Sequence, residues 1–277
     1  MVINLKLFYG NKKLVNRQGE KMDQITFQKN YTMQSVHKAI HVLRAFSKEQ
    51  PRLSLTELHK KTGIGISSLQ RFVSTLVYEG FLHKDEKTKE YQLGLSLLYL
   101  GYLVEQESSL LTISKPILQR INDETGESVC INIIDGDERR CIFNLDTTHP
   151  LSAKTFVGHT SPLYAGASAK CLLACLTDQE LNEYFERVQL IPITNQTIID
   201  VDALKKELTA IRSQGYALSR SERVVGAYSV STAILLPTNR PLASISIVIP
   251  EARVEQYSER QLIDLILSAK LQIERQL

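Results

Sequence analysis

Four polar side chains recur on one predicted helix at spacing that suits the reading of DNA bases. They occupy positions i, i+3, i+4 and i+7 of residues 66–78, and they are Ser67, Gln70, Arg71 and Ser74. Arginine can hold guanine through two hydrogen bonds, glutamine can hold adenine, and serine hydroxyls bind phosphates or base edges. The segment contains no Asp or Glu, which an ordinary solvated helix face usually carries. This face is therefore predicted to lie in the major groove.

Two shorter helices and a glycine turn are predicted to position that helix. The first helical pattern starts at Ser35 as its cap, and Pro51 is expected to stop it. Ser54 followed three residues later by Glu57 is a capping-box signature, which opens a second short helix. Residues 62–65 read Thr-Gly-Ile-Gly and supply the turn into the third helix. This order is typical of a helix-turn-helix.

A β-hairpin wing is predicted after the third helix. Residues 81–84 and 90–94 favour strands, and the polar residues 85–89 favour a turn between them. Lysines on such a wing reach phosphates and position the protein without reading the base sequence. Asp85 and Glu86 dilute the charge of the wing, so its contribution is expected to be modest. The candidate DNA contacts are Ser67, Ser68, Gln70, Arg71 and Ser74 on the helix, and Lys84, Lys87 and Lys89 on the wing.

The charge of the chain is unevenly distributed, which agrees with this prediction. The 277 residues include 33 Lys and Arg and 30 Asp and Glu. Residues 1–95 hold 16 of the basic and 8 of the acidic residues, so the N-terminal part is basic and the remainder acidic. This asymmetry favours a polyanion-binding module joined to a second domain. No apolar run of about 18 residues could span a membrane, and no secretion signal opens the chain, so a cytoplasmic location is predicted.

The rest of the sequence mixes helices with antiparallel hairpins, which predicts the α+β class. Residues 95–107 form an apolar run without proline, and they are predicted to be a connecting helix that buries one face against a partner chain. Further helices are predicted at 110–125, interrupted near its start by Pro116, at 169–188 with a break, at 201–214 and from 258. Hairpin strands are predicted at 129–134 with 141–145, and at 229–236 with 242–249.

Three stretches carry a family resemblance. The first, SLTELHKKTGIGISSLQRFVSTLVYEGFLHKDEKTKEYQLG, spans residues 54–94. The others are GHTSPLYAGASAKCLLACL at 158–176 and TIIDVDALKKELTAIRSQGYALSRSERVVGAYSVSTAIL at 197–235. Together they resemble the IclR family of bacterial transcription regulators, over roughly residues 35–277. The match in the first stretch is specific, because the cap, turn, helix and wing all agree.

The resemblance implies a GAF-like effector domain that closes a small pocket between its sheet and loops. Ser219 stands where the family usually has an acid, and Tyr164 where it usually has a histidine. The helix N-terminus at Ala167 and Ser168 suits a carboxylate, because free N–H groups and the helix dipole favour an anion there. The hydroxyl-rich pocket suggests a hydroxylated acid as effector. The implied pocket positions are Ala153, Ser161, Ala167, Ser168, Ser219, Ser229, Ser246 and Val248.

Three side chains near these positions are open to more than one interpretation. Glu222 and Arg223 read either as ligand contacts or as a surface salt bridge. Lys170 could hold a ligand anion, but a lysine on the flank of a helix is expected to point to water. Cys171 and Cys175 stand four apart in a helical pattern and are expected to pack in a core.

The predicted domains are a flexible basic tail at 1–31, a winged helix-turn-helix at 32–94, a linker helix at 95–109 and an effector domain at 110–277. The leading hypothesis is a regulator without enzymatic activity, cofactor or metal, whose partners are double-stranded operator DNA, a small-molecule effector and further copies of itself. The copies would form a homodimer or a dimer of dimers.

The sequence leaves two other classes of protein open. The first is an enzyme with Cys141 or Cys171 as nucleophile and His149 or His159 as base, although no activating motif surrounds either cysteine. The second is a DNA-organising protein that binds without a ligand. A structural zinc site is not expected, because the sequence has no CxxC pair.

Overall fold

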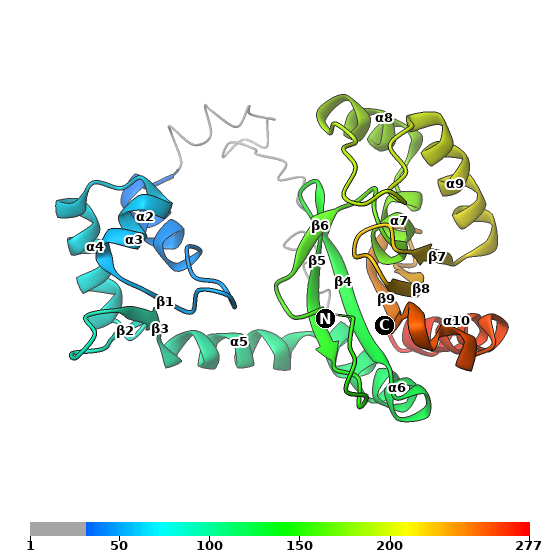
Figure 1. The fold of residues 1–277 in the computed structure, drawn as a ribbon, viewed down its shortest axis with the longest axis horizontal. Coiled ribbons are helices and arrows are strands. Elements are labelled where there is room, and N and C mark those ends of the chain that lie inside the picture. The colour runs from blue at the N-terminus through cyan, green and yellow to red at the C-terminus, as the bar shows by residue number, and fades with distance from the viewer. Residues whose placement is uncertain (1–31, 154) are drawn as a thin grey trace. The chain divides into compact units, whose positions relative to one another are not determined.

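The computed structural model describes residues 32–153 and 155–277 (Figure 1). The described residues divide into two units, 32–108 and 109–277, and each unit is described by itself. The tail predicted for residues 1–31 lies outside the described residues. Within the described ranges, no helix is both long and apolar enough to cross a membrane.

The N-terminal unit packs three helices against a small antiparallel sheet. Its helices are α2 (Gln34–Leu43), α3 (Leu55–Thr62) and α4 (Ile66–Tyr78). The sheet has the order β1-β3-β2 and is built from β1 (Arg52–Leu53), β2 (Leu82–Lys84) and β3 (Tyr91–Leu93). Leu58, Leu69, Val73 and Leu82 are buried together and hold these elements around one core. The third helix and the wing hairpin are confirmed, whereas the two-residue strand β1 was not predicted.

Both ends of α3 are fixed by local capping interactions, as predicted, whereas the start of α2 differs from the prediction. At α3, Ser54 Oγ accepts the Glu57 N–H while the Glu57 carboxylate accepts the Ser54 N–H, so the capping box is confirmed. Gly63 ends α3 at φ +67°, a conformation that favours glycine. The start of α2 differs, because Met33 is the N-cap and makes no side-chain cap bond, so the prediction that Ser35 caps this helix is wrong. The helix ends at Leu43, well before Pro51.

Helix α5 (Leu95–Glu107) follows β3 and has the predicted bounds. None of its residues is buried, and Leu95, Leu98 and Tyr99 are 82%, 71% and 63% exposed. A 13-residue helix is marginally stable in water on propensity alone. Because these apolar side chains are exposed, they are not packed against the part of the chain that the structure describes.

The C-terminal unit is built on a six-stranded antiparallel sheet in the order β6-β5-β4-β9-β8-β7. The strands are β4 (Ser128–Asp135), β5 (Glu138–Leu145), β6 (Thr160–Pro162), β7 (Ala217–Arg220), β8 (Ala227–Leu235) and β9 (Pro241–Pro250). The helices are α6 (Ser109–Thr125), α7 (Ala167–Ala174), α8 (Asp178–Arg187), α9 (Val201–Gln214) and α10 (Glu259–Glu274), with a 3-10 turn η2 (Glu251–Gln256). This mixture confirms the predicted α+β class.

The two faces of the sheet carry different cores. On β9, Ile245, Ile247 and Ile249 pack with residues of α6 and α10. Because side chains alternate along a strand, Ser246 and Val248 face the other side, where α7 packs against β8 and β9. Helices α7, α8 and α9 form a second apolar cluster there. A polar face of β9 is thus enclosed beneath α7.

Three details of this unit differ from the sequence prediction. Pro116 is the eighth residue of α6 rather than part of its first turn, and the helix continues through it. Strand β5 begins at Glu138 instead of 141, which adds Glu138, Arg139 and Arg140 to the sheet. The edge strands β6 and β7 are three and four residues long and were not predicted.

Candidate functional site

Helix α4 divides into a buried apolar face and an exposed polar face. Leu69, Val73 and Leu76 are buried in the N-terminal core and fix the helix. The five helix residues predicted to contact DNA are all exposed, namely Ser67, Ser68, Gln70, Arg71 and Ser74. Gln70 Nε2 donates to Ser74 Oγ at 3.2 Å. Within the described ranges Arg71 forms no ion pair, so its guanidinium is available to an outside acceptor.

The wing presents its three lysines unequally. Lys87 and Lys89 are exposed and Lys84 is half-buried. Lys89 Nζ lies 3.0 Å from a carboxylate oxygen of Glu86, so its charge is partly balanced. The turn is held by Asp85, whose carboxylate accepts the backbone N–H of Lys87 at 2.8 Å. Lys87 is therefore the wing lysine best placed to reach a phosphate.

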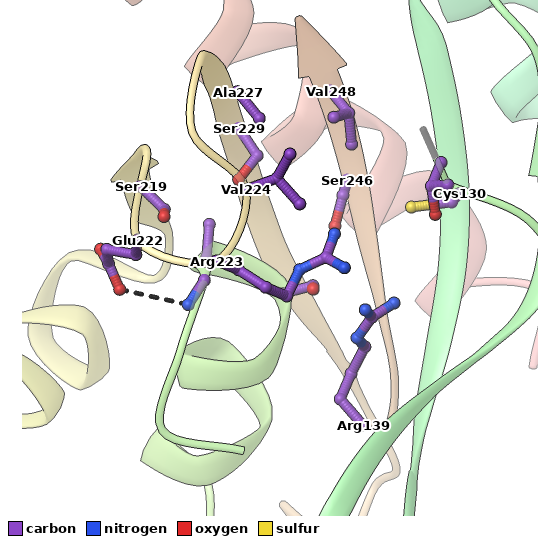
Figure 2. Close-up of a pocket in the computed structure, with 14 residues that line it drawn as sticks. Cys130, Arg139, Ser219, Glu222, Arg223, Val224, Ala227, Ser229, Ser246 and Val248 are labelled. Atoms are coloured by element: carbon purple, nitrogen blue, oxygen red, sulfur yellow. Dashed lines mark hydrogen bonds between the residues drawn. The ribbon is translucent and has the colours of Figure 1, made fainter. Parts of the chain in front are cut away.

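A small pocket lies in the C-terminal unit on the polar face of the sheet (Figure 2). Its walls come from β4, β5, β7, β8, β9, the N-terminus of α7 and the loop 221–226. Its free volume is about 30 Å³, which is room for about two ordered waters. Six of the eight predicted positions line it, namely Ala167, Ser168, Ser219, Ser229, Ser246 and Val248. The structure thus brings together residues from distant parts of the sequence.

The other two predicted positions lie behind the pocket wall. Ala153 packs against Cys130, Cys141 and Val248 and does not line the cavity. Ser161 is 5% exposed, and its hydroxyl accepts a hydrogen bond from an arginine that does line the cavity. Both positions therefore support the wall, and a role for them in effector binding stays a prediction.

Arg139, on β5, lines the pocket and was missed by the sequence analysis. It is 1% exposed. Its Nη1 donates to Asn132 Oδ1 at 2.6 Å and its Nε to Ser161 Oγ at 3.0 Å. Its Nη2 is buried and has no hydrogen-bond partner among the described residues. Burial lowers the pKa of this guanidinium. One donor is thus left for a molecule inside the pocket.

Arg223, on the loop 221–226, enters the pocket from the opposite side, as Figure 2 shows. Its Nη1 lies 3.2 and 3.3 Å from the two ring nitrogens of His159. Such equal distances indicate that the guanidinium lies over the ring, and that ring stacks on Phe156 at 5.0 Å. Burial, together with the charge of Arg139, lowers the pKa of Arg223 to about 10. Burial in the pocket therefore disfavours the charged form of both arginines.

Glu222 and Lys170 form a buried pair at the N-terminus of α7. Lys170 is 1% exposed, and its Nζ lies 2.6 Å from Glu222 Oε1 and 3.0 Å from Glu207 Oε1. The expectation that Lys170 points to water is wrong, and Glu222 forms a buried pair rather than a surface salt bridge. Glu222 Oε2 also accepts the N–H of Gly166 at 3.1 Å (Figure 2). A protein carboxylate thus already sits at the helix N-terminus expected to hold a ligand carboxylate.

Neither cysteine considered as a nucleophile, Cys141 or Cys171, is accessible to solvent. Cys141 and Cys171 are each 1% exposed. Burial raises the pKa of the Cys171 thiol, and its Sγ donates to the Ser231 carbonyl at 3.2 Å. Cys171 packs in the core as expected, and Cys175 packs against it half-buried. In the described ranges no cluster of three potential metal ligands occurs.

Comparison with known proteins agrees with this arrangement. Residues 35–86 match the family model described as the IclR helix-turn-helix domain, and residues 103–275 match that of the bacterial transcriptional regulator IclR C-terminal. The HTH-type transcriptional regulator KipR of Bacillus subtilis is 33% identical over 243 residues, which cover 88% of this chain and 96% of the relative.

Solved structures share the same fold. The crystal structure of the Thermotoga maritima IclR is 28% identical, with a TM-score of 0.71 over 89% of this chain and 99% of its own. An IclR homolog from Microbacterium hydrocarbonoxydans, crystallised with 4-hydroxybenzoate, has a TM-score of 0.79 at 19% identity. It covers 88% of this chain and 98% of that chain, and at this identity it shows the fold alone.

Proposed function

Because the chain belongs to the IclR family of DNA-binding transcription regulators, we propose that a small organic acid in its C-terminal unit alters its affinity for operator DNA. Its relatives are transcription regulators, and this chain is likewise a regulator and not an enzyme. The relatives include the transcriptional repressor IclR of Escherichia coli, which is 25% identical. The proposal concerns what this regulator responds to and which residues it uses.

The observation that carries the proposal is the polar pocket of the C-terminal unit. Hydroxyl groups of Ser168, Ser219 and Ser229 and two guanidinium groups line it, which is an unusual set for the interior of a structural core. The 4-hydroxybenzoate found with one homolog is itself a hydroxylated carboxylate. A small organic acid that also carries a hydroxyl group is therefore the proposed effector.

The exposed face of α4 is the proposed base-reading surface. The helix is anchored by its apolar face, and its polar face meets no other described residue that would hide it. Arg71 is the residue best suited to guanine and Gln70 to adenine. The lysines of the wing are proposed to bind phosphates, with Lys87 the more available.

We propose that two or four copies of the chain act together, with α5 as part of the contact between copies. The effector would favour one of two arrangements of these copies, because a ligand shifts an equilibrium only through its differential affinity for the two states. The arrangement sets the separation of two α4 helices relative to half-sites about 34 Å apart. Ligand binding would in this way alter DNA affinity.

Fluorescence anisotropy with a duplex selected from a random pool by the full-length protein tests the DNA surface. Arg71→Ala should reduce the preference for the selected duplex over a scrambled one by about tenfold or more, since one good base contact contributes about 1–3 kcal/mol. Lys87→Ala should weaken both duplexes about equally and serves as the matched control. If Arg71→Ala leaves the preference unchanged, α4 does not read the bases.

The same assay tests the response to a ligand. Titration with small acids, 4-hydroxybenzoate among them, should change the affinity for the selected duplex. A DNA affinity that no small molecule alters would favour the alternative of a ligand-independent DNA-organising protein.

A further inference from the structure

Two guanidinium groups face the pocket, and no carboxylate of the described residues balances them. Neither Arg139 nor Arg223 takes part in an ion pair among the described residues. The one acidic residue in the wall, Glu222, is already bound to the Lys170 ammonium and to a backbone N–H. The cavity is therefore lined by two guanidinium groups that have no carboxylate partner among the described residues. The Cys130 thiol lies in the same wall, and its pKa is lowered by a hydrogen bond with Cys141 and by the charges of Arg139 and Arg223.

A buried charge without an ionic partner destabilises a folded protein. Such a residue is therefore expected to have a functional role, such as ligand binding, rather than to stabilise the unliganded protein. Arg139 is nearly inaccessible to solvent and keeps one Nη2 group unpartnered. Among the described residues, the hydrogen-bond contacts of the Arg223 guanidinium go only to the ring nitrogens of His159. Figure 2 shows both side chains directed into the same space from β5 and from the loop 221–226.

We infer that the effector is a dianion, a small molecule with two negative charges, and that Arg139 and Arg223 bind those charges. This inference rests on the proposed function, since it names the chemical class of the effector of that site. The planar set of guanidinium donors matches the paired oxygens of a carboxylate or a phosphate. A monoanion would leave one of the two guanidinium groups without a carboxylate or phosphate partner.

The part of the wall formed by α7 sets a second requirement on the ligand. Glu222 occupies the N-terminus of α7, so a ligand carboxylate placed there would meet a negative charge at close range. The Glu222 carboxylate and the hydroxyls of Ser168 and Ser219 instead suit a hydroxyl or amino group, which can donate to them. The ligand therefore places its anionic groups at the arginines and its hydrogen-bond donors at α7.

The pocket must enlarge to take such a molecule. Its free volume of about 30 Å³ is below that of a four-carbon diacid. Arg223 is the lining group that can move, because its guanidinium makes no hydrogen bond to a described residue other than the contact with His159. Its loop lies between β7 and β8 and has Ser221 at φ +55°. Binding would draw Arg223 from the ring onto the ligand.

Isothermal titration calorimetry of the full-length protein with matched four-carbon probes tests the charge requirement. Succinate and butyrate differ by one carboxylate, and glycerol 3-phosphate tests whether the dianion is a phosphate. At least one dianion should bind tenfold or more tightly than butyrate. Succinate alone would identify a dicarboxylate, and glycerol 3-phosphate alone a phosphate ester. Equal binding of butyrate and both dianions, or no binding of either dianion at millimolar concentration, would overturn the inference.

Variants at two neighbouring arginines show whether the pocket is the site. Arg223→Gln should bring the affinity for the preferred dianion to within about twofold of that for butyrate. Arg220→Gln is the control, because Arg220 is exposed on β7 and stacks over Tyr228 outside the pocket. The inference fails if both variants keep the preference for the dianion.

The unliganded protein supplies a second, independent readout. Arg223→Met removes a buried charge that has no carboxylate partner among the described residues and should raise the Tm of the free protein by about 2–4 °C, whereas loss of a merely structural arginine would lower it. A lower Tm would count against the inference. If the dianions fail but a small monocarboxylic acid still alters DNA affinity, the inference is wrong and the proposed function stands. If no small molecule alters DNA affinity, the proposed function itself is wrong.

Discussion

Replacing Lys170 by methionine should destabilise the C-terminal unit strongly. The Lys170 ammonium is 1% exposed and lies 2.6 Å from the Glu222 carboxylate, which is itself 7% exposed. Without the lysine, Glu222 would keep only the Gly166 N–H as a hydrogen-bond donor within the described ranges. Breaking a buried pair by removing one partner costs about 3–5 kcal/mol. The positive end of α7 beside Glu222 offsets part of this cost, so about 3 kcal/mol is expected.

Thermal and urea unfolding followed by circular dichroism measure this cost. A loss of about 3 kcal/mol corresponds to a fall in Tm of about 6–12 °C for a unit of this size. Because the chain has two units, the transition of the C-terminal unit must be followed separately from that of the N-terminal unit. Glu207→Gln is the mild control, since the Glu207 side chain is 37% exposed and should contribute less than about 1 kcal/mol.

The double variant Lys170→Met with Glu222→Leu separates charge imbalance from lost packing. Replacing both members of a buried pair by apolar groups of similar volume is close to neutral. The double variant should therefore recover most of the stability that Lys170→Met loses. A cost for Lys170→Met below about 1 kcal/mol, or a double variant less stable than the single one, would refute this account of the pair.

Three further changes test other parts of the structure. Ser54→Ala removes the capping box of α3 and should cost about 1 kcal/mol in urea unfolding of the N-terminal unit, whereas Ser54→Gly should cost only a few tenths of that. Gly94→Ala places a Cβ against a neighbouring backbone carbonyl and should abolish DNA binding by displacing the wing, while Gly101→Ala meets open space and should leave DNA binding intact. Arg253→Ala leaves the fully buried Glu127 carboxylate without its guanidinium partner, and a calorimetric loss of about 3–5 kcal/mol is expected; an unchanged Tm would show that the ion pair is dispensable.

The N-terminal unit was predictable because its signals are local. The capping box from Ser54 to Glu57, the turn at Gly63 and the amphipathic pattern of residues 66–78 each need only a few neighbouring residues. These signals agree with one another, so they leave few alternatives open. The strand β1 escaped prediction because two residues carry no periodicity, and its pairing with β3 joins distant segments.

The pocket was only partly predictable, because burial of charged groups is decided by tertiary structure. Residues 138–140 read Glu-Arg-Arg, a composition that favours a solvated turn, so β5 was expected to begin at Cys141. Extending the strand backward with a period of two would have put Arg139 on the same face as Cys141. No such pattern exists for Arg223, which lies in a loop. The pairing of Lys170 with Glu222 likewise joins segments far apart in the sequence.

The central pairing of the large sheet sets the order in which the protein can fold during its synthesis. Strand β4 pairs with β9, so residues 128–132 cannot complete their backbone hydrogen bonds until residues 244–248 have been synthesised. The N-terminal unit, by contrast, is complete once residue 108 has left the ribosome. Pairing over such a separation is slow, and an open apolar strand can associate with other nascent chains. A chain cut short before β9 would thus retain a folded DNA-binding end while losing Ser246 and Val248 from the cavity wall.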